Sequence, residues 1–186
     1  MRRASRWLLL AGMLASAAGA HAGTVVISQA DVGFIQSPEA PYEGRLLIGF
    51  QLPEVLSRST VELAVLELRA SITCSEGTSG VAVDAFPLTA EWDPATAGWS
   101  EGWSTPGGDF DMLLHAAWGA RPGENSLVRF DVTDAVSAWA SGKLANRGLL
   151  VATEPDDGGV IGARDSRRAE GPVLKVYYTD RGAGER

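Results

Sequence analysis

Residues 98–102 of the chain, Gly-Trp-Ser-Glu-Gly, match the G-x-S-x-G pattern of a serine-hydrolase nucleophile elbow. In such an elbow a strand leads into the serine and a helix leads away from it. Here Pro94 stands shortly before Ser100, and the motif is followed by Trp-Ser-Thr-Pro-Gly-Gly, so loops are favoured on both sides. A match this short also arises by chance. We therefore expect Ser100 to be an ordinary loop residue and the protein to have no catalytic site.

Tryptophan side chains in the same region suggest a second kind of chemistry, the binding of sugars. An exposed indole stacks on the apolar face of a sugar ring and offers a large contact area at low entropic cost. Trp99, Trp103 and Trp118 lie in segments without strand-like alternation, and they are candidate ligand-binding residues. The alternative for each is a place in the scaffold, because tryptophan is mostly buried in folded proteins. For Trp92 and Trp139 the core is the expected place.

Two acidic turns suggest a calcium site. Asp109 and Asp111 lie in Gly-Gly-Asp-Phe-Asp, and Asp156 and Asp157 lie in Glu-Pro-Asp-Asp-Gly-Gly. Calcium prefers several oxygen ligands from flexible loops, although neither stretch has the spacing of an EF-hand. The alternative is that these carboxylates are solvated turn residues. Calcium is the one cofactor that the sequence suggests.

A run of arginines near the C-terminus offers a different site, one for an acidic glycan. Arg164 and Arg167, with Arg168 beside them, could hold anionic groups through charge-assisted, bidentate hydrogen bonds. They could equally pair with Asp165 and Glu170 nearby. Both interpretations remain open at the level of the sequence.

The N-terminus has the three parts of a secretory signal peptide. Three arginines lie within the first six residues, an apolar run follows, and Ala20-His21-Ala22 fits the small-x-small cleavage pattern. We expect residues 1–22 to be removed and the mature protein to be secreted or periplasmic. The apolar run is too short and too rich in Gly and Ala to predict a membrane span, which needs about 20 apolar residues. With a single cysteine, Cys74, no intramolecular disulfide can form.

The charge of the chain argues against nucleic acid as a partner. Without the signal peptide the chain has 13 basic and 23 acidic residues, which gives a net charge of −10. Phosphate backbones select positively charged surfaces, and this chain shows no interleaving of basic and aromatic residues. Polysaccharide or a surface glycan is the partner that fits better, and the oligomeric state is open.

The pattern of hydrophobic residues predicts an all-β domain. From Thr24 onward apolar and polar residues alternate with period two, and Gly, Pro, Ser or Asp interrupts them about every ten residues. The expected strands cover residues 24–35, 45–52, 61–72, 81–88, 126–132, 147–154, 159–163 and 173–179. Clean alternation predicts strands with one buried and one solvent-facing side. Together they make one domain, residues 23–179, followed by a polar tail, residues 180–186.

One short helix near residues 132–141 interrupts the strands. Asp131 or Thr133 can cap its first turn, and Gly142 can end it. A helix this short is stable only when it packs against a sheet. Many strands, short connections and one packed helix predict an antiparallel two-sheet β-sandwich of jelly-roll topology.

Several of these segments together resemble the disaggregatase-related (DNRLRE) domain of secreted bacterial and archaeal proteins. The resemblance covers about residues 25–179. Its most specific part consists of Phe130-Asp131-Val132-Thr133, Val136, Trp139, Gly142 and Asn146-Arg147-Gly148-Leu149-Leu150. Trp92 and Trp99 also have the spacing of the family's tryptophans, whereas Pro94 and Arg168 stand where acidic residues are common.

The resemblance implies a jelly-roll sandwich with a non-catalytic accessory role. Such domains often accompany polysaccharide-degrading enzymes or occur in surface proteins, and some relatives are carbohydrate-binding modules. From the residues and the resemblance together, we expect a secreted, non-catalytic module that binds polysaccharide or a cell-surface glycan. The alternative is a structural or adhesive protein of the envelope or matrix that has no specific glycan ligand.

Overall fold

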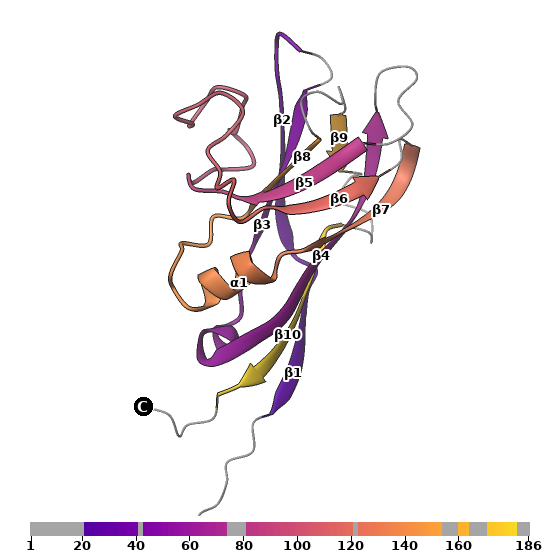
Figure 1. Cartoon of the computed structure of the whole chain (residues 1–186). Coiled ribbons are helices and arrows are strands. Elements are labelled where there is room, and N and C mark those ends of the chain that lie inside the picture. Colours follow the sequence, from indigo (N-terminus) through magenta and orange to yellow (C-terminus); the bar gives the residue numbers. More distant parts are fainter. Residues whose placement is uncertain are drawn as a thin grey trace, which may run out of the picture.

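Ten strands, one α-helix and one short 3-10 helix make up the described part of the chain (Figure 1). The computed structural model describes residues 21–40, 43–73, 81–120, 123–153, 160–163 and 171–181. The strands are β1 (Ala22–Ile27), β2 (Ala30–Gln36), β3 (Gly44–Phe50), β4 (Ser59–Thr73), β5 (Val81–Pro87), β6 (Ala116–Ala120), β7 (Gly123–Asp131), β8 (Leu149–Thr153), β9 (Val160–Ala163) and β10 (Val173–Asp180). The helices are η1 (Glu54–Arg58) and α1 (Thr133–Ala140).

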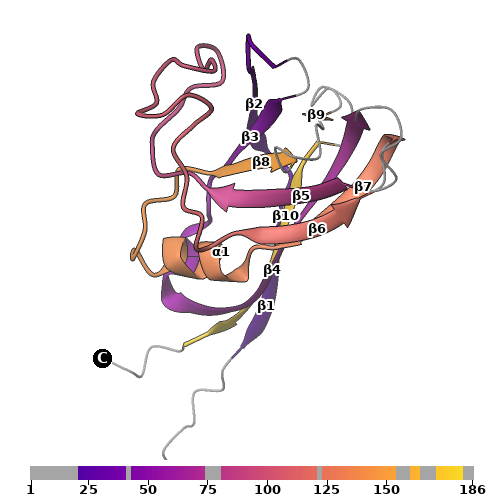
Figure 2. The same ribbon diagram turned by 45° about the horizontal axis from the view of Figure 1, so that its top comes forward.

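The strands form two sheets with the order of a jelly roll. One sheet has the order β1-β10-β4-β7 and the other β2-β3-β8-β5-β6, while β9 pairs with both β4 and β3 and joins them. With β2 and β9 set aside, the chain changes sheet at each connection except the one from β5 to β6. This alternation places strands that are distant in sequence side by side, and it is the double Greek key of a jelly roll. The predicted antiparallel two-sheet sandwich is confirmed (Figure 2).

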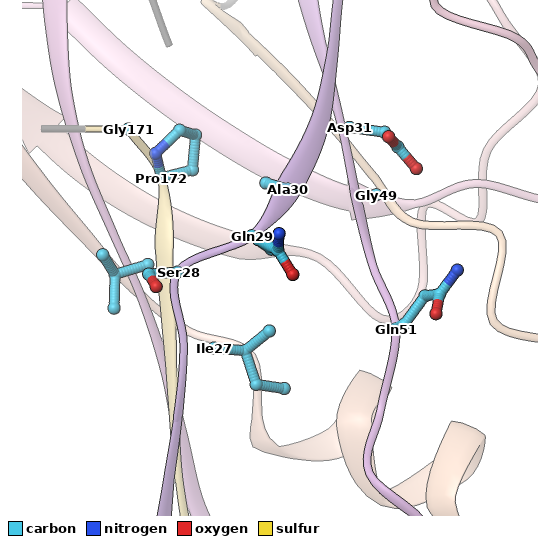
Figure 3. A pocket seen from close by; sticks show the side chains of 10 residues that line it. Ile27, Ser28, Gln29, Ala30, Asp31, Gly49, Gln51, Gly171 and Pro172 are labelled. Atoms are coloured by element: carbon cyan, nitrogen blue, oxygen red, sulfur yellow. The ribbon is translucent and has the colours of Figure 1, made fainter. Parts of the chain in front are cut away.

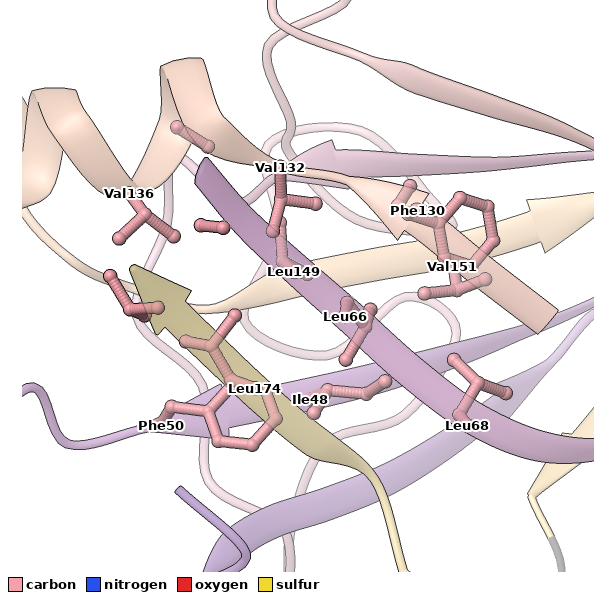
Figure 4. Close-up of a cluster of buried hydrophobic side chains, with 14 of the residues drawn as sticks. Ile48, Phe50, Leu66, Leu68, Phe130, Val132, Val136, Leu149, Val151 and Leu174 are labelled. Carbon is pink, nitrogen blue, oxygen red and sulfur yellow. The ribbon is translucent and has the colours of Figure 1, made fainter. Parts of the chain in front are cut away.

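The space between the sheets is filled by aliphatic and aromatic side chains (Figure 4). They come from alternate positions of strands in both sheets, as period-two patterns require. The most buried members include Leu46, Ile48, Leu66, Leu68, Phe130, Leu149, Val151, Leu174 and Val176. This core provides most of the stabilisation of the fold, because burying each such side chain contributes about 1.5 to 3 kcal/mol.

The helix α1 lies against β4 and adds its apolar face to the same core. The Thr133 hydroxyl oxygen accepts the N–H of Ala64 at 2.9 Å, and the hydroxyl donates to Asp131 at 2.5 Å. Gly142 follows the helix with a φ of 72° and donates its N–H to the carbonyl of Trp139 at 3.0 Å. The predicted helix and its glycine stop are confirmed, and Trp139 is buried as expected.

The structure differs from the strand predictions in two places. The segment 24–35 is two strands, because the chain crosses between the sheets at Ser28 and Gln29, so that β1 pairs with β10 and β2 with β3. The strand β6 was predicted as a loop, since its residues are mostly small and show no alternation. Trp118 therefore lies in a strand, opposite Val83.

The prediction of one solvent-facing side is wrong for β3. Leu47 points away from the main core, yet its side chain has no exposed surface. It belongs to a second hydrophobic cluster with Ile35, Leu88, Leu150 and Ala152, on the outer face of the sheet that contains β3. The connection between β5 and β6 covers this face.

Candidate functional site

The connection between β5 and β6, residues 88–115, is a folded cap over the outer face of one sheet. In Figure 2 it stands at one side of the sandwich, beside β5 and β8. Trp92, Trp99, Trp103 and Phe110 from this cap pack against the second hydrophobic cluster. Three tryptophans that the sequence places close together are thus brought to one surface, where they are half-buried.

Trp92 is fitted onto two glycines of the sheet. A β-carbon on Gly33 of β2 would lie 3.0 Å from its Cζ3, and one on Gly49 of β3 would lie 3.4 Å from its Cζ2. Its Nε1 donates to the carbonyl of Arg147 at 2.9 Å. The indole can lie this close to the strands because neither glycine carries a side chain.

Trp99 packs against a half-buried arginine. The guanidinium carbon of Arg45 lies 4.9 Å from the ring centre of Trp99 and 5.4 Å from that of Phe110. The Nη1 of Arg45 donates to the carbonyl of Gly107 at 2.7 Å, and Arg45 forms an ion pair with Glu43 at 3.4 Å. Burial lowers the pKa of Arg45, and the charge of Glu43 acts in the opposite direction. These contacts assign Trp99 to the scaffold of the cap.

Trp103 has one polar contact within the cap and one side on an open cavity. Its Nε1 donates to the carbonyl of Gly98 at 2.8 Å, which fixes the ring. The same residue lines a cavity together with Trp92. Of the three tryptophan candidates, Trp103 therefore has an indole beside a cavity.

The carboxylates of Asp109 and Asp111 bind the backbone of their own loop. Asp109 accepts the Ser104 N–H at 2.8 Å, its hydroxyl at 2.7 Å and the Thr105 N–H at 3.1 Å. These bonds, the one from the Ser104 backbone above all, lower the pKa of Asp109. Asp111 accepts the N–H of Leu113 at 2.8 Å. Both carboxylates therefore accept hydrogen bonds from backbone N–H groups of their own turns.

Ser100 of the G-x-S-x-G motif lies exposed in the same cap. Its N–H donates to the Glu101 carboxylate at 3.2 Å. The residues on either side form turns and bends, with neither a strand before the serine nor a helix after it. His115 is held elsewhere, stacked on Phe86 with its Nδ1 3.0 Å from the carbonyl of Met112. The geometry of a nucleophile elbow is not present at Ser100.

A cavity of about 670 Å³ lies where β1 turns into β2 (Figure 3). Gln29 and Asp31 line it from this turn and from β2, and Gln51 lines it from the end of β3. Gly171 and Pro172 close it from the start of β10. The three polar side chains are exposed and provide both donors and acceptors of hydrogen bonds.

Two further cavities continue from the first toward the cap. The second, of about 320 Å³, shares Asp31, Gly49 and Gln51 with the first and is also lined by Trp92. The third, of about 560 Å³, shares Trp92 with the second and ends at Trp103. We refer to these three adjoining cavities as the groove. It combines amide side chains in its first part with two indoles in its last.

The lining of the groove is acidic. Asp31, Glu91, Asp93 and Glu101 contribute four carboxylates, all exposed. Arg147 is the one cationic side chain among the described lining residues, and it lies 4.0 Å from Glu91. The electrostatic potential along the groove therefore favours neutral or positively charged ligands.

For several sequence-predicted residues the structure gives no side-chain description. Trp118 lies in β6, but its side chain is not among those that the structure describes. Arg164, Arg167 and Arg168, together with Asp156, Asp157 and Cys74, lie outside the described residues, as does most of the expected signal peptide. At the other end, β10 continues through Asp180 into the expected tail, and Arg181 donates to the carbonyl of Ser59 at 3.0 Å.

The polar residues of the groove were missed by reasoning from the sequence. Gln29 and Gln51 are single polar residues at strand ends, and Glu91 is one acid in an acidic chain. None belongs to a motif, and the topology alone brings them together. Trp92, expected in the core, both packs against the sheet and lines two of the cavities.

A search of protein-family models finds none that matches the chain, and a search of curated proteins finds no match either. Within the described ranges, no helix is long and apolar enough to cross a membrane. The same residues contain no group of three or more His, Cys, Asp or Glu side chains placed to hold a metal ion.

Proposed function

We propose that the protein is a secreted, non-catalytic β-sandwich module that binds polysaccharide in the groove. The observation that carries this proposal is that the three adjoining cavities are lined by both amide and indole side chains. The amides are those of Gln29 and Gln51, and the indoles are those of Trp92 and Trp103. Sugars are recognised by paired hydrogen bonds to their hydroxyls and by aromatic contact with their C–H faces. An open row of cavities suits a chain of sugar units better than one compact molecule.

Two features of the sequence support the same proposal. The N-terminal segment has the pattern of a secretory signal, which would bring the module into contact with extracellular glycans. The resemblance to the disaggregatase-related domain favours an accessory role without catalysis. Ser100 fits this role, because it lies exposed without the strand, helix and base that a nucleophile needs.

The second candidate is a structural or adhesive protein with no specific glycan ligand. It is favoured by the indole contacts, since the N–H groups of Trp92 and Trp103 already donate to carbonyls of the protein itself. In that case the tryptophans serve only to fix the cap to the sheet. The two proposals differ in whether any soluble glycan binds.

Titration calorimetry of the mature protein with a panel of soluble neutral oligosaccharides tests the proposal. The panel contains β-linked glucose, xylose, mannose and N-acetylglucosamine oligomers. We expect at least one to bind, and we expect Gln29→Ala with Gln51→Ala to weaken it about tenfold through lost hydrogen bonds. The control is Glu62→Ala, an exposed residue of β4 outside the groove, which should bind as the wild type does. Absence of binding across this panel and across charged glycans would support the structural alternative.

A further inference from the structure

We propose that the groove selects glycans that carry protonated amino groups, such as polymers with free glucosamine units, over glycans that carry carboxylate or sulfate. This inference rests on the proposed function and names its ligand class. It begins from the charge of the lining, where four carboxylates face one guanidinium among the described residues. The net charge of the mature chain, −10, has the same sign.

The carboxylates are distributed along the whole groove. Asp31 lies where the first two cavities meet, Glu91 where the second and third meet, and Asp93 and Glu101 in the third. A polymer lying in the groove would thus pass a carboxylate in each cavity. An ammonium group has three donors and no acceptor, so it pairs with a carboxylate at almost any rotation.

These carboxylates keep acceptor capacity for a ligand. Glu101 receives one hydrogen bond, from the N–H of Ser100 at 3.2 Å. One oxygen of Asp93 accepts both the N–H of Ala95 at 2.8 Å and the hydroxyl of Thr96 at 3.4 Å, so the other oxygen of this exposed residue remains available as an acceptor. Within the described part of the chain, the one charged partner of Glu91 is Arg147 at 4.0 Å, and the Glu91 side chain is 89 % exposed.

Arg147, the one arginine among the described lining residues, does not reverse this preference. The Arg147 side chain is 34 % exposed, and its Nε is buried without a hydrogen-bond partner within the described structure. A uronate or sulfate approaching it would also meet Glu91. Bringing like charges together in this way disfavours binding.

The test compares three oligosaccharide classes of matched length by titration calorimetry at slightly acidic pH. They are a glucosamine oligomer with free amines, the same oligomer fully N-acetylated, and an oligouronate. We expect the free-amine oligomer to bind at least tenfold more tightly than the acetylated one, and this advantage to shrink at high salt because the charges are exposed. We expect no measurable binding of the oligouronate.

A pair of charge-neutralising variants assigns the effect to the groove. Glu91→Gln with Glu101→Gln should weaken binding of the free-amine oligomer far more than binding of the acetylated oligomer, and so remove most of the free-amine advantage. The matched control, Glu54→Gln with Glu62→Gln, changes the net charge equally on exposed residues outside the groove. Equal loss in the control would overturn the inference, because the total charge of the chain would then account for the preference.

Other outcomes separate this inference from the proposed function. Equal affinity for the acetylated and free-amine oligomers would overturn the charge preference while leaving glycan binding in place. Tight binding of the oligouronate would overturn it as well. If none of the three oligomers binds and no oligosaccharide of the neutral panel binds either, both the charge preference and the proposed glycan binding are wrong.

Discussion

The indole of Trp92 rests on Gly33, with its Cζ3 atom 3.0 Å from the position that a β-carbon would take on the glycine. This contact fixes the first tryptophan of the cap to the outer face of the sheet. It also sets one wall of the groove, since Trp92 lines two of the three cavities. The absence of a side chain at Gly33 is therefore a condition for both the cap and the groove.

Replacing Gly33 with valine should displace Trp92. The branched side chain would overlap the indole, and overpacking of this kind costs about 1 to 3 kcal/mol. We expect a lower free energy of unfolding in urea and a red shift of tryptophan fluorescence in the folded state. Gly171→Val is the control, because a β-carbon there meets nothing within 4 Å. Unchanged stability and emission of Gly33→Val would contradict the described contact.

Arg45 should stabilise the cap far more than an exposed arginine does. Its side chain is 16 % exposed and binds the Gly107 carbonyl, so Arg45→Ala leaves a void and an unpaired carbonyl, at a cost of about 2 kcal/mol or more. Arg58→Ala makes the same substitution at an exposed ion pair with Glu54, 3.6 Å apart. That pair should contribute less than about 0.5 kcal/mol. If Arg45→Ala and Arg58→Ala lower the urea midpoint of unfolding equally, Arg45 stabilises the protein no more than an exposed arginine does.

Asp84 should make the stability depend on pH in a defined direction. It is a buried carboxyl on β5, and burial raises its pKa, while the charge of His115 acts in the opposite direction. The folded state then binds this proton more tightly than the unfolded state, whose aspartate has a pKa of about 3.9. The contribution of Asp84 to stability is therefore full below that value and is lost as pH rises through the raised pKa.

The substitution Asp84→Asn should remove the loss of stability that ionisation of Asp84 causes as the pH rises. We expect the variant to be more stable than the wild type at neutral pH, and the difference to shrink as the pH falls through the raised pKa of Asp84 toward about 4. Chemical unfolding at a series of pH values measures it. Glu62→Gln, on an exposed position of β4, serves as the comparison. A difference that does not vary with pH would exclude the titration of Asp84 as its cause.

The main core of the fold could be predicted from the sequence because it depends on local patterns. Period-two alternation located β3, β4, β7 and β10, and a capped apolar stretch located α1. Two errors have local causes. No Gly or Pro marks the crossing at Ser28 and Gln29, and the small residues of β6 do not alternate.

The candidate site could not be predicted in the same way. Leu47 looked like a solvent-facing apolar residue because the cap that covers it lies far along the chain. The contact of Trp92 with Gly33 and Gly49 depends on the pairing of β2 with β3. The polar lining of the groove has no sequence signature, since its residues come from separate segments that include the turn from β1 into β2, the end of β3, and the cap. The tryptophan spacing in the sequence does not show which of the indoles lie beside a cavity.

The most direct test of the account locates the glycan on the protein. Backbone amide and indole N–H signals of the isotope-labelled mature protein are followed by NMR while the glucosamine oligomer or a neutral oligosaccharide of the panel is added. We expect shifts concentrated at Gln29, Gln51, Trp92 and Trp103, and a weakened response in Gln29→Ala with Gln51→Ala. Shifts confined to the outer face of the β1-β10-β4-β7 sheet, or no shifts with any saccharide, would contradict the assignment of the groove as a glycan-binding site.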